Sequence, residues 1–441
     1  MNSEEPEVLH YDEIPFGHWG VINAENFKRE IIREYAQENP DTVSALENLG
    51  LEEVIGQVER SGCRALERVL RKVPKKRWDF TLSRNIQLNI NGSSVTLQDK
   101  YDGRFALISA VRGIRPVEYS ERKEEPKQES DLFLKIISGE DYAITIAKDE
   151  QAHESPFSIS PKREELSDSR ALTIINRFPA YARVIDSALE EYINRRISNK
   201  HTKISKGINL VTIPTTYYER IEDAPAEDLT SMLSSLKAGL LSVKMAAEER
   251  GIRYIPVYLF FNIGRNVGGS LKRLHAQAYI DLNQDGHGST MEDILKAFEE
   301  QERAGRCKFC QPSTWQREEF LIYENEFCSA YATRAPIRNF DTKIIPKRHV
   351  EDITMLSRDE LLGLSEALIT VSKALNRIGA HPDRNILIYQ RPFNYNSFFH
   401  AFIQILPFEN VGGMEMMDEA RVVRVDPADF AEKMRGIISN T

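Results

Sequence analysis

The sequence predicts an α+β protein in which two successive halves of strands and helices follow a mainly helical N-terminal segment. Apolar residues recur at helical spacing within residues 24–37 and 41–73. From Ile208 to Gln277 the pattern changes to strand, proline, long helix, strand, loop and strand. The same order returns from Phe340 to Gln404, and an internal repeat of this kind indicates two similar structural units. We therefore divide the chain into residues 1–95, 96–304 and 305–441.

Composition restricts the functions that this chain can have. Its 441 residues allow two or three domains, and 41% hydrophobic with 28% charged residues is ordinary for a soluble protein. The net charge of −9 offers no basic field for nucleic acid, so we expect no nucleic-acid partner. No apolar run reaches bilayer length, and the N-terminus lacks the pattern of a secretory signal. With four cysteines and one C-x-x-C pair, we expect a cytoplasmic protein without a membrane association.

Residues 254–282 carry the clearest chemical signal. An apolar strand (Tyr254–Phe261) leads through a connection rich in glycine and asparagine (Asn262–Ser270) into a second strand (Leu274–Leu282). Residues two apart in a strand share a face, so His275 and Gln277 point to the same side. Glycines in the connection allow positive φ and close approach of a ligand to the backbone. This arrangement predicts a phosphate site that contains a nucleophile. The alternative is a core histidine that satisfies a hydrogen bond.

The motif resembles the active-site loop of a known family. Asn262, Gly264, Gly268, Ser270, His275 and Gln277 match in order the galactose-1-phosphate uridylyltransferase branch of the histidine-triad superfamily. That family usually shows H-P-H-x-Q, and its second histidine attacks the α-phosphorus of a nucleotide. In this chain the nucleophile and the glutamine match, whereas Arg273 replaces the first histidine. The resemblance implies that each half is an antiparallel sheet with packed helices, that the halves form one unit, and that a homodimer is allowed.

The resemblance also implies roles for the residues of this loop. His275 would form a nucleotidyl-histidine, which requires that its attacking nitrogen is bare because a carbonyl holds the other nitrogen. Gln277, Ser270 and N–H groups of the connection would donate to the phosphate oxygens as charge shifts onto them. The residues expected to bind the phosphate in the connection are Asn262, Gly268 and Gly269.

Further contacts to the substrates are expected outside this stretch. Arg112 and Arg115 follow a strand similar to the first strand of the family, and two guanidinium groups there suit phosphate binding. The alternative is two exposed arginines on a loop. Asn176 and Phe178 match the family's N-x-F-x-A turn, which binds the nucleoside. Glu415 matches a glutamate that contacts sugar hydroxyls, and Arg421 near it favours an anionic or otherwise different acceptor.

A zinc site is predicted in the second half. Two cysteines in C-x-x-C and two later histidines form a tetrahedral ligand set, and they follow the family's ligand order. These residues are Cys307, Cys310, His349 and His400. The alternative is that the two histidines are ordinary surface or core residues. In the first half, Ser155, Ser158 and Arg273 stand where the family has ligands, so we expect no zinc there. In the second half, Phe402 stands at the place of the nucleophile.

These inferences together predict a nucleotidyltransferase. It would act on a nucleotide sugar or dinucleoside polyphosphate through a covalent intermediate on His275, with structural zinc. Two alternatives remain open at this point. One is a nucleotide hydrolase of the same superfamily, in which water is the acceptor. The other is a catalytically silent nucleotide-binding protein. The base, the sugar and the acceptor are not determined by the sequence.

Overall fold

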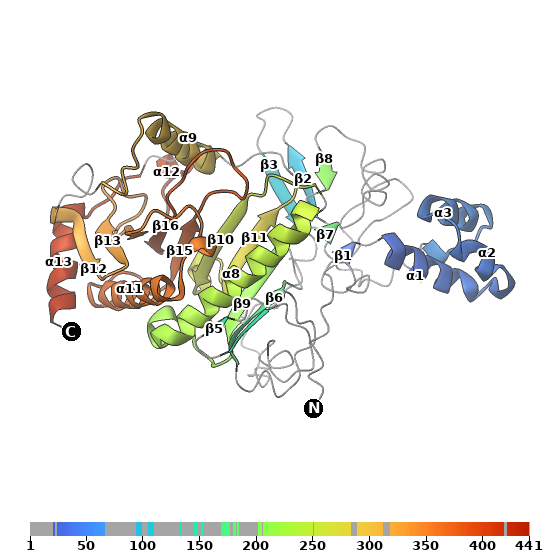
Figure 1. Ribbon diagram of the computed structural model, residues 1–441, viewed down its shortest axis with the longest axis horizontal. Coiled ribbons are helices and arrows are strands. Elements are labelled where there is room, and N and C mark those ends of the chain that lie inside the picture. The colour runs from blue at the N-terminus through green and yellow to red at the C-terminus, as the bar shows by residue number, and fades with distance from the viewer. Residues whose placement is uncertain are drawn as a thin grey trace.

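A large antiparallel sheet with helices packed on it dominates the molecule (Figure 1). The computed structural model describes residues 21–22, 24–66, 94–98, 105–109, 133, 145–148, 151–152, 169–176, 180–181, 183–184, 202–204, 206–249, 251–283, 289–311, 318–418 and 421–440. Within these ranges the architecture is mixed α and β, as the sequence predicts. Five residues for which the sequence analysis makes predictions lie outside the described residues: Arg112, Arg115, Ser155, Ser158 and Phe178.

Eleven strands form the large sheet, and every neighbouring pair in it is antiparallel. In sheet order they are β12 (Leu321–Glu324), β13 (Cys328–Ala332), β14 (Thr342–Pro346), β16 (Phe402–Pro407), β15 (Arg384–Tyr389), β10 (Val257–Ile263), β11 (Ala276–Asp281), β9 (Gly207–Pro214), β6 (Ser169–Ile175), β4 (Thr145–Lys148) and β5 (Gln151–Ala152). The strand predicted over 208–213 and the strand that carries Gln277 therefore pair directly, as β9 and β11.

The pairing of β10 with β15 joins strands that lie more than a hundred residues apart in the sequence. Its register places Asn262 opposite Asn385 and Phe260 opposite Leu387. Both strands alternate buried and half-buried residues, so one face of each strand is covered and the other is partly open. His275, Gln277 and Asn262 belong to the partly open face, because paired residues in antiparallel strands point to the same side.

Two helices cover the other face of the sheet. The helix α8 (Ala226–Glu249) packs on β6 and β9, α11 (Arg358–Arg377) packs on β13 and β14, and the two helices contact each other (Figure 1). A capping box between Ser357 and Glu360 begins α11, and Gly251 at φ 77° follows the end of α8. Their apolar faces and the strands beneath them form one core cluster that extends through residues of both predicted halves. Burial of this apolar surface stabilises the strands and helices on either side of the predicted boundary as one core.

The remaining described elements lie around this unit. They are α9 (Ser289–Arg303), α12 (Gly413–Asp418), α13 (Pro427–Ser439), a three-stranded sheet of β3 (Phe105–Ser109), β2 (Ser94–Gln98) and β8 (Thr202–Ile204), and the pair β1 (Val21–Ile22) and β7 (Arg183–Val184). At the N-terminal side, α1 (Ala24–Ala36), α2 (Val43–Glu47) and α3 (Leu51–Arg60) pack together. The helical pattern of residues 41–73 is broken at Gly50, because glycine favours a cap over a helix interior.

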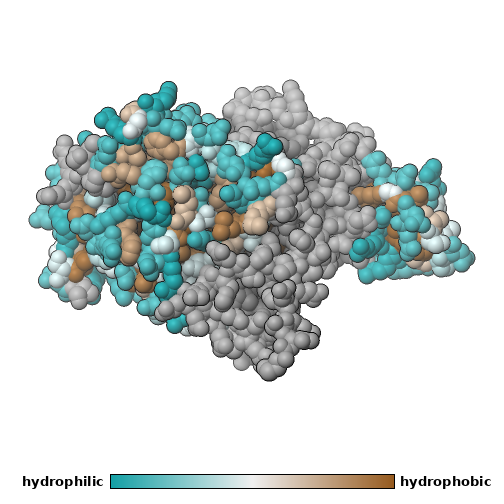
Figure 2. All heavy atoms as spheres, in the orientation of Figure 1, coloured by the Kyte–Doolittle hydropathy of each residue, from teal (hydrophilic) through white to brown (hydrophobic). Residues whose placement is uncertain are grey.

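Hydrophilic residues are interspersed with apolar ones over the described parts of the face drawn in Figure 2. This mixture is typical of helices that bury one stripe and turn the other outward. No helix among the described residues is both long and apolar enough to cross a membrane.

Candidate active site and metal centre

His275 lies immediately before β11, at the end of the sheet where β10 leads into its glycine-rich connection. Its side chain is only 6% exposed. The ring Nδ1 lies 2.8 Å from the backbone oxygen of Arg273. A carbonyl oxygen can only accept a hydrogen bond, so Nδ1 must carry the proton. The predicted mechanism requires a carbonyl at one ring nitrogen of His275, and the backbone oxygen of Arg273, two residues earlier, provides it.

Gln277 supports the same assignment of the imidazole proton. Its amide nitrogen lies 3.4 Å from Nε2 of His275, from the next position on the same face of the strand. An amide NH₂ group can only donate, so Nε2 must accept with its lone pair. The two contacts agree on one tautomer, with the proton on Nδ1 and the lone pair on Nε2. This is the form of histidine that can attack phosphorus.

The connection between β10 and His275 is a compact loop built on glycines. A single turn of 3-10 helix, η6 (Arg265–Val267), stands between Gly264 at φ 94° and Gly268 at φ 86°. The N–H of Gly268 donates to the oxygen of Arg265 at 3.2 Å, and that of Gly269 to Gly264 at 3.0 Å. These two donors are thus used inside the loop. Phosphate binding by Gly268, Gly269 and the half-buried Ser270 stays a prediction.

Asn262 lies at the start of this loop and points to the second half of the chain. Its Oδ1 accepts a hydrogen bond from Nδ2 of Asn385 at 2.8 Å, and the same Asn385 amide donates to the oxygen of Val267 at 3.1 Å. Asn385 was not singled out by the sequence. The predicted role of Asn262 in nucleotide binding is untested, but its present contact fixes the loop.

Arg273 is held by backbone oxygens at the end of β9. It precedes β11, is 3% exposed, and donates from Nη2 to the backbone oxygens of Pro214 at 2.6 Å and Thr215 at 2.7 Å. The guanidinium also lies over the ring of Tyr217, 5.6 Å from its centroid. Arg273 therefore ties the segment before the nucleophile to the end of β9. The sequence offers Arg273 two roles, a contact to the substrate's phosphate or an ion pair with Glu164 or Glu165, and both glutamates lie outside the described residues.

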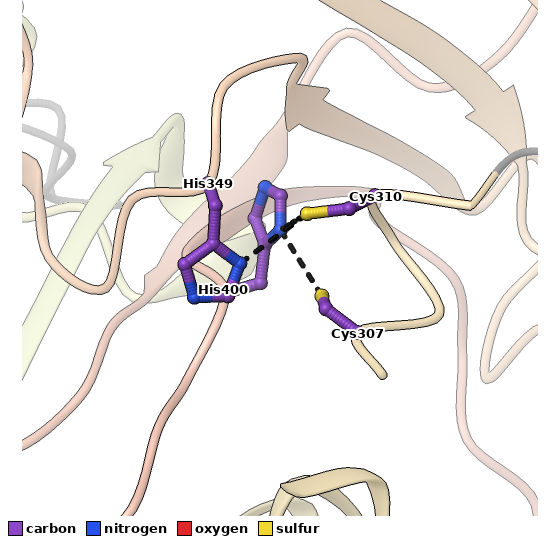
Figure 3. A group of neighbouring side chains, drawn as sticks. All are labelled: Cys307, Cys310, His349 and His400. Carbon is purple, nitrogen blue, oxygen red and sulfur yellow. Dashed lines mark hydrogen bonds between the residues drawn. The ribbon is translucent and has the colours of Figure 1, made fainter. Parts of the chain in front are cut away.

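The four predicted metal ligands come together in the structure (Figure 3). Their ligand atoms all lie within 4.8 Å of one another. Nδ1 of His400 lies 3.4 Å from Sγ of Cys307 and 3.5 Å from Sγ of Cys310, while Nδ1 of His349 lies 3.3 Å from Sγ of Cys310. Tetrahedral bonds of the usual zinc lengths separate sulfur and nitrogen ligands by about 3.5 Å. The geometry fits a single tetrahedral ion.

The surroundings of these ligands also suit a metal. Nε2 of His400 lies 2.9 Å from the backbone oxygen of Pro346, which fixes the proton on Nε2 and leaves Nδ1 facing the thiols. Burial lowers the pKa of His400 to about 4 and lowers the pKa of His349, so both imidazoles are neutral, as metal binding requires. Burial raises the pKa of the Cys310 thiol to about 12. A bound cation opposes that effect by favouring the thiolate.

The metal group and His275 lie at opposite ends of the sheet. The pairings of β16 with β15, β15 with β10 and β10 with β11 place Phe402 in the row of Tyr279. His275 lies four residues before Tyr279, and His400 lies two residues before Phe402. Because β16 and β11 run in opposite directions, these two offsets point to opposite ends of the sheet. Strand spacings of about 4.8 Å and a rise of about 3.3 Å per residue separate the two sites by roughly 25 Å. The four candidate metal ligands therefore make no contact with His275.

The counterpart of the active site in the second half has a different construction. Phe402 stacks on Tyr389 with ring centroids 4.7 Å apart, and Nζ of Lys343 lies 5.3 Å from its centroid. Gln404 donates to both oxygens of Asp341, at 3.0 and 2.8 Å. Burial raises the pKa of Asp341 and lowers that of Lys343. The amide of Gln404, which corresponds to Gln277, is thus hydrogen-bonded to Asp341. The sequence did not indicate Asp341.

The acceptor and nucleoside residues have local partners. The carboxylate of Glu415 accepts from the N–H groups of Gly412 and Val422, and Nη1 of Arg421 donates to the backbone oxygen of Glu415 at 3.2 Å. Glu415 borders a cavity of about 820 Å³ at the His275 end of the sheet, beside Pro407 at the end of β16. The N–H of Asn176 donates to the oxygen of Asn209. Roles of these residues in substrate binding stay predictions.

Comparison with known proteins supplies the relatives of this chain. The sequence matches no protein-family profile. It is 25% identical over 160 residues to the galactose-1-phosphate uridylyltransferase of Thermotoga maritima, covering 35% of this chain and 49% of that protein. The predicted resemblance is confirmed. The match with this chain thus spans about half the length of that curated relative.

Solved structures agree at the level of the fold. A uridylyltransferase structure superposes with a TM-score of 0.55 at 17% identity, covering 79% of this chain and 99% of that one. An ADP-glucose phosphorylase from Arabidopsis thaliana with bound ADP-glucose gives 0.53 at 20% identity, covering 77% and 98%. A uridylyltransferase mutant gives 0.52 at 20% identity, covering 62% and 89%. This chain therefore shares the fold of these three structures.

Proposed function

We propose that this chain is a nucleotidyltransferase that acts on a nucleotide sugar through a covalent nucleotidyl-His275 intermediate. The observation that carries the proposal is the single tautomer of His275, which the oxygen of Arg273 and the amide of Gln277 both require. A core histidine needs only one satisfied hydrogen bond. Here the nitrogen without the proton is the one that faces the amide of Gln277, on the partly open face of the sheet.

The reaction has two steps that exchange bonds at one phosphorus. The lone pair of Nε2 attacks the α-phosphorus, an N–P bond forms, and the bond to the bridging oxygen breaks so that the sugar phosphate leaves with its electron pair. The positive charge on the imidazole is stabilised by the Arg273 oxygen at Nδ1. An oxygen of the acceptor phosphate then attacks the same phosphorus, and the N–P electron pair returns to Nε2. Gln277 donates to the phosphoryl oxygens in both steps.

The relatives support the class of substrate. Two of the structural neighbours are a uridylyltransferase and an ADP-glucose phosphorylase with bound ADP-glucose, and the sequence relative is a galactose-1-phosphate uridylyltransferase. The three names describe uridylyl transfer or the phosphorolysis of ADP-glucose. We infer the same class here, with Glu415 and Arg421 at the acceptor and Arg112, Arg115, Asn176 and Phe178 at the nucleotide.

We further propose that the metal is one structural Zn²⁺ per chain. The tetrahedral set of two thiols and two imidazoles, with a carbonyl behind His400, suits zinc better than the harder divalent cations. When bound, zinc would join the segment of Cys307 and Cys310 to the start of β16 and so contribute to folding. The distance of roughly 25 Å from His275 supports a structural role.

The strand order supports the proposal of two tandem histidine-triad-like halves. Outward from the β10–β15 pair, one side reads β11, β9, β6 and the other reads β16, β14, β13. In each series the first strand carries the glutamine of the motif, and a long helix packs on the outer two strands. The proposed boundaries are residues 96–304 and 305–441, after an N-terminal extension over residues 1–95.

The test is to incubate the protein with α-labelled ADP-glucose and UDP-glucose and to look for acid-labile label on the protein. We expect label on His275 in the parent and none in His275→Asn, while nucleotide binding and melting temperature stay near those of the parent. Product analysis with and without added phosphate separates transfer from hydrolysis, because transfer to phosphate yields the labelled nucleoside diphosphate whereas hydrolysis yields the labelled nucleoside monophosphate. A parent that binds nucleotide without label or turnover would instead indicate a silent nucleotide-binding protein.

A further inference from the structure

The glycine loop before His275 is held by residues of the second half. Asp383 immediately precedes β15 and is 8% exposed. Its Oδ2 accepts from the backbone N–H of Asn266 at 3.1 Å and from the Asn266 side-chain amide at 2.9 Å. Both hydrogen bonds reach across 117 residues of sequence. The carboxylate thus holds the 3-10 turn of the loop at its centre.

Gly264 shows how closely Asp383 approaches the loop. A Cβ built on Gly264 would lie 2.0 Å from Oδ1 of Asp383, far inside van der Waals contact, and the residue also has φ 94°. Glycine is therefore required here both by its backbone conformation and by the carboxylate beside it. Gly264, just after β10, therefore leaves the space that the Asp383 carboxylate occupies.

The carboxylate is itself held in place. Nη2 of Arg220 donates to Oδ1 of Asp383 at 3.3 Å, and Nη1 of the same arginine donates to the oxygen of Pro382 at 2.6 Å. The N–H of Asp383 donates to Nδ1 of His381 at 3.0 Å, and its oxygen accepts from the N–H of Phe408 at 2.8 Å. Arg220 orients the carboxylate, and the other contacts hold the backbone of Pro382 and Asp383, so Asp383 offers the loop a fixed anchor.

We propose that Asp383 is a positioning residue for the transfer reaction, acting through Asn266 and the glycine loop on the groups that surround the phosphate at His275. The inference rests on the proposed function and adds to it that the second half of the chain sets the geometry of the active site in the first. Loop donors act on charge that develops at the phosphorus, so a displacement of about 1 Å lowers the rate by up to about a hundredfold.

The test compares Asp383→Asn with Asp426→Asn. Asp426 also accepts two backbone N–H groups, but at the start of α13. We measure the single-turnover rate of His275 labelling by α-labelled ADP-glucose or UDP-glucose, the nucleotide Kd and the melting temperature. In Asp383→Asn we expect the labelling rate to fall at least tenfold, with Kd within about threefold of the parent. Asp426→Asn should label at the parental rate.

A second variant guards against misfolding. The Asn266 side chain is exposed, so Asn266→Ala should leave the fold unchanged and lower the labelling rate less than Asp383→Asn does. The double variant should fall no further than Asp383→Asn alone, because both changes act on one contact. Labelling within twofold of the parent in Asp383→Asn, or a loss that merely follows the melting temperature, would overturn the inference.

Hydrogen exchange separates this inference from the proposed function. If the parent takes no label, the proposed function fails, and exchange at residues 264–270 then decides the role of Asp383. Faster exchange of the Asn266 amide in Asp383→Asn, but not in Asp426→Asn, supports the positioning of the loop. Equal exchange in both variants overturns it.

Discussion

Gln277 and Gln404 lie in one row and on one face of the large sheet, three strands apart, yet their side-chain amides donate to different groups. The register runs from Gln277 through Phe260 and Leu387 to Gln404. Gln277 donates to the imidazole of His275, whereas Gln404 donates to the carboxylate of Asp341. Gln277 is directed at the proposed nucleophile, and Gln404 is held within the core by Asp341.

This difference predicts opposite results for one substitution at the two positions. Gln404→Leu removes a donor pair from the buried Asp341, so we expect a loss of about 1–3 kcal/mol in the free energy of unfolding and unchanged labelling of His275. Gln277→Leu should lower the labelling rate at least tenfold with a smaller loss of stability. Chemical denaturation and single-turnover labelling of both variants check the prediction, and equal profiles would contradict it.

Arg273→Ala should cost stability more than nucleotide affinity. The variant removes charge-assisted hydrogen bonds to the oxygens of Pro214 and Thr215, for which we expect a loss of about 1.5–3 kcal/mol. Arg273→Lys keeps the charge but not the fork of donors, so it should fall between the parent and the alanine variant. A variant that melts like the parent but binds nucleotide tenfold worse, about 1.4 kcal/mol, would assign Arg273 to the phosphate instead.

Zinc should be lost from Cys310→Ser and kept by Cys63→Ser. The first substitution removes a ligand of the tetrahedral set, so we expect the melting temperature to fall by roughly 5 °C or more. Cys63 lies in the N-terminal part and contacts Glu38, far in sequence from the ligands, which makes it the matched control. Metal analysis of protein purified without chelator, with less than half an equivalent in the parent, would refute the site.

Acid stability should depend on Glu360. Nε and Nη2 of Arg348 donate to its two oxygens at 2.6 and 2.8 Å and lower the pKa of Glu360 to about 2. Since the folded pKa lies below the unfolded value of about 4.3, the stabilisation is complete above that value and is lost as the pH falls toward 2. Glu360→Gln should therefore lose less stability than the parent between pH 4.5 and 2. Parallel curves from denaturant titrations would contradict this assignment.

The sequence predicted the parts whose signal is local. Strands β9 and β11, the helix α8 and the C-x-x-C pair follow from periodicity and spacing, because those patterns depend on near neighbours. Their boundaries were less accurate. The strand expected from Leu274 begins at Ala276, and the Arg273 side chain before it donates to the oxygens of Pro214 and Thr215 at the end of β9. The mechanism called for a carbonyl at Nδ1 of His275, but a backbone oxygen has no letter in the sequence. The sequence therefore did not indicate that this carbonyl belongs to Arg273, or that two other carbonyls hold the Arg273 side chain.

Contacts between distant segments account for what the sequence missed. Asp383, Asn385 and Asp341 match no motif, and each acts on a group far away in the sequence or on a buried amide. Only the register of β10 with β15 brings the first two to the glycine loop. A single sequence contains no direct record of such pairing.

The pairing of β10 with β15 has a consequence for any attempt to divide the protein. Separated at residues 304 and 305, each half would expose an unprotected edge strand, with a row of unpaired N–H and C=O groups beside apolar residues such as Phe260 and Leu387. Such edges recruit other strands, so the isolated halves should self-associate or aggregate. Co-expressed, the two fragments would cap each other's edges and reconstitute the sheet without a peptide bond between them.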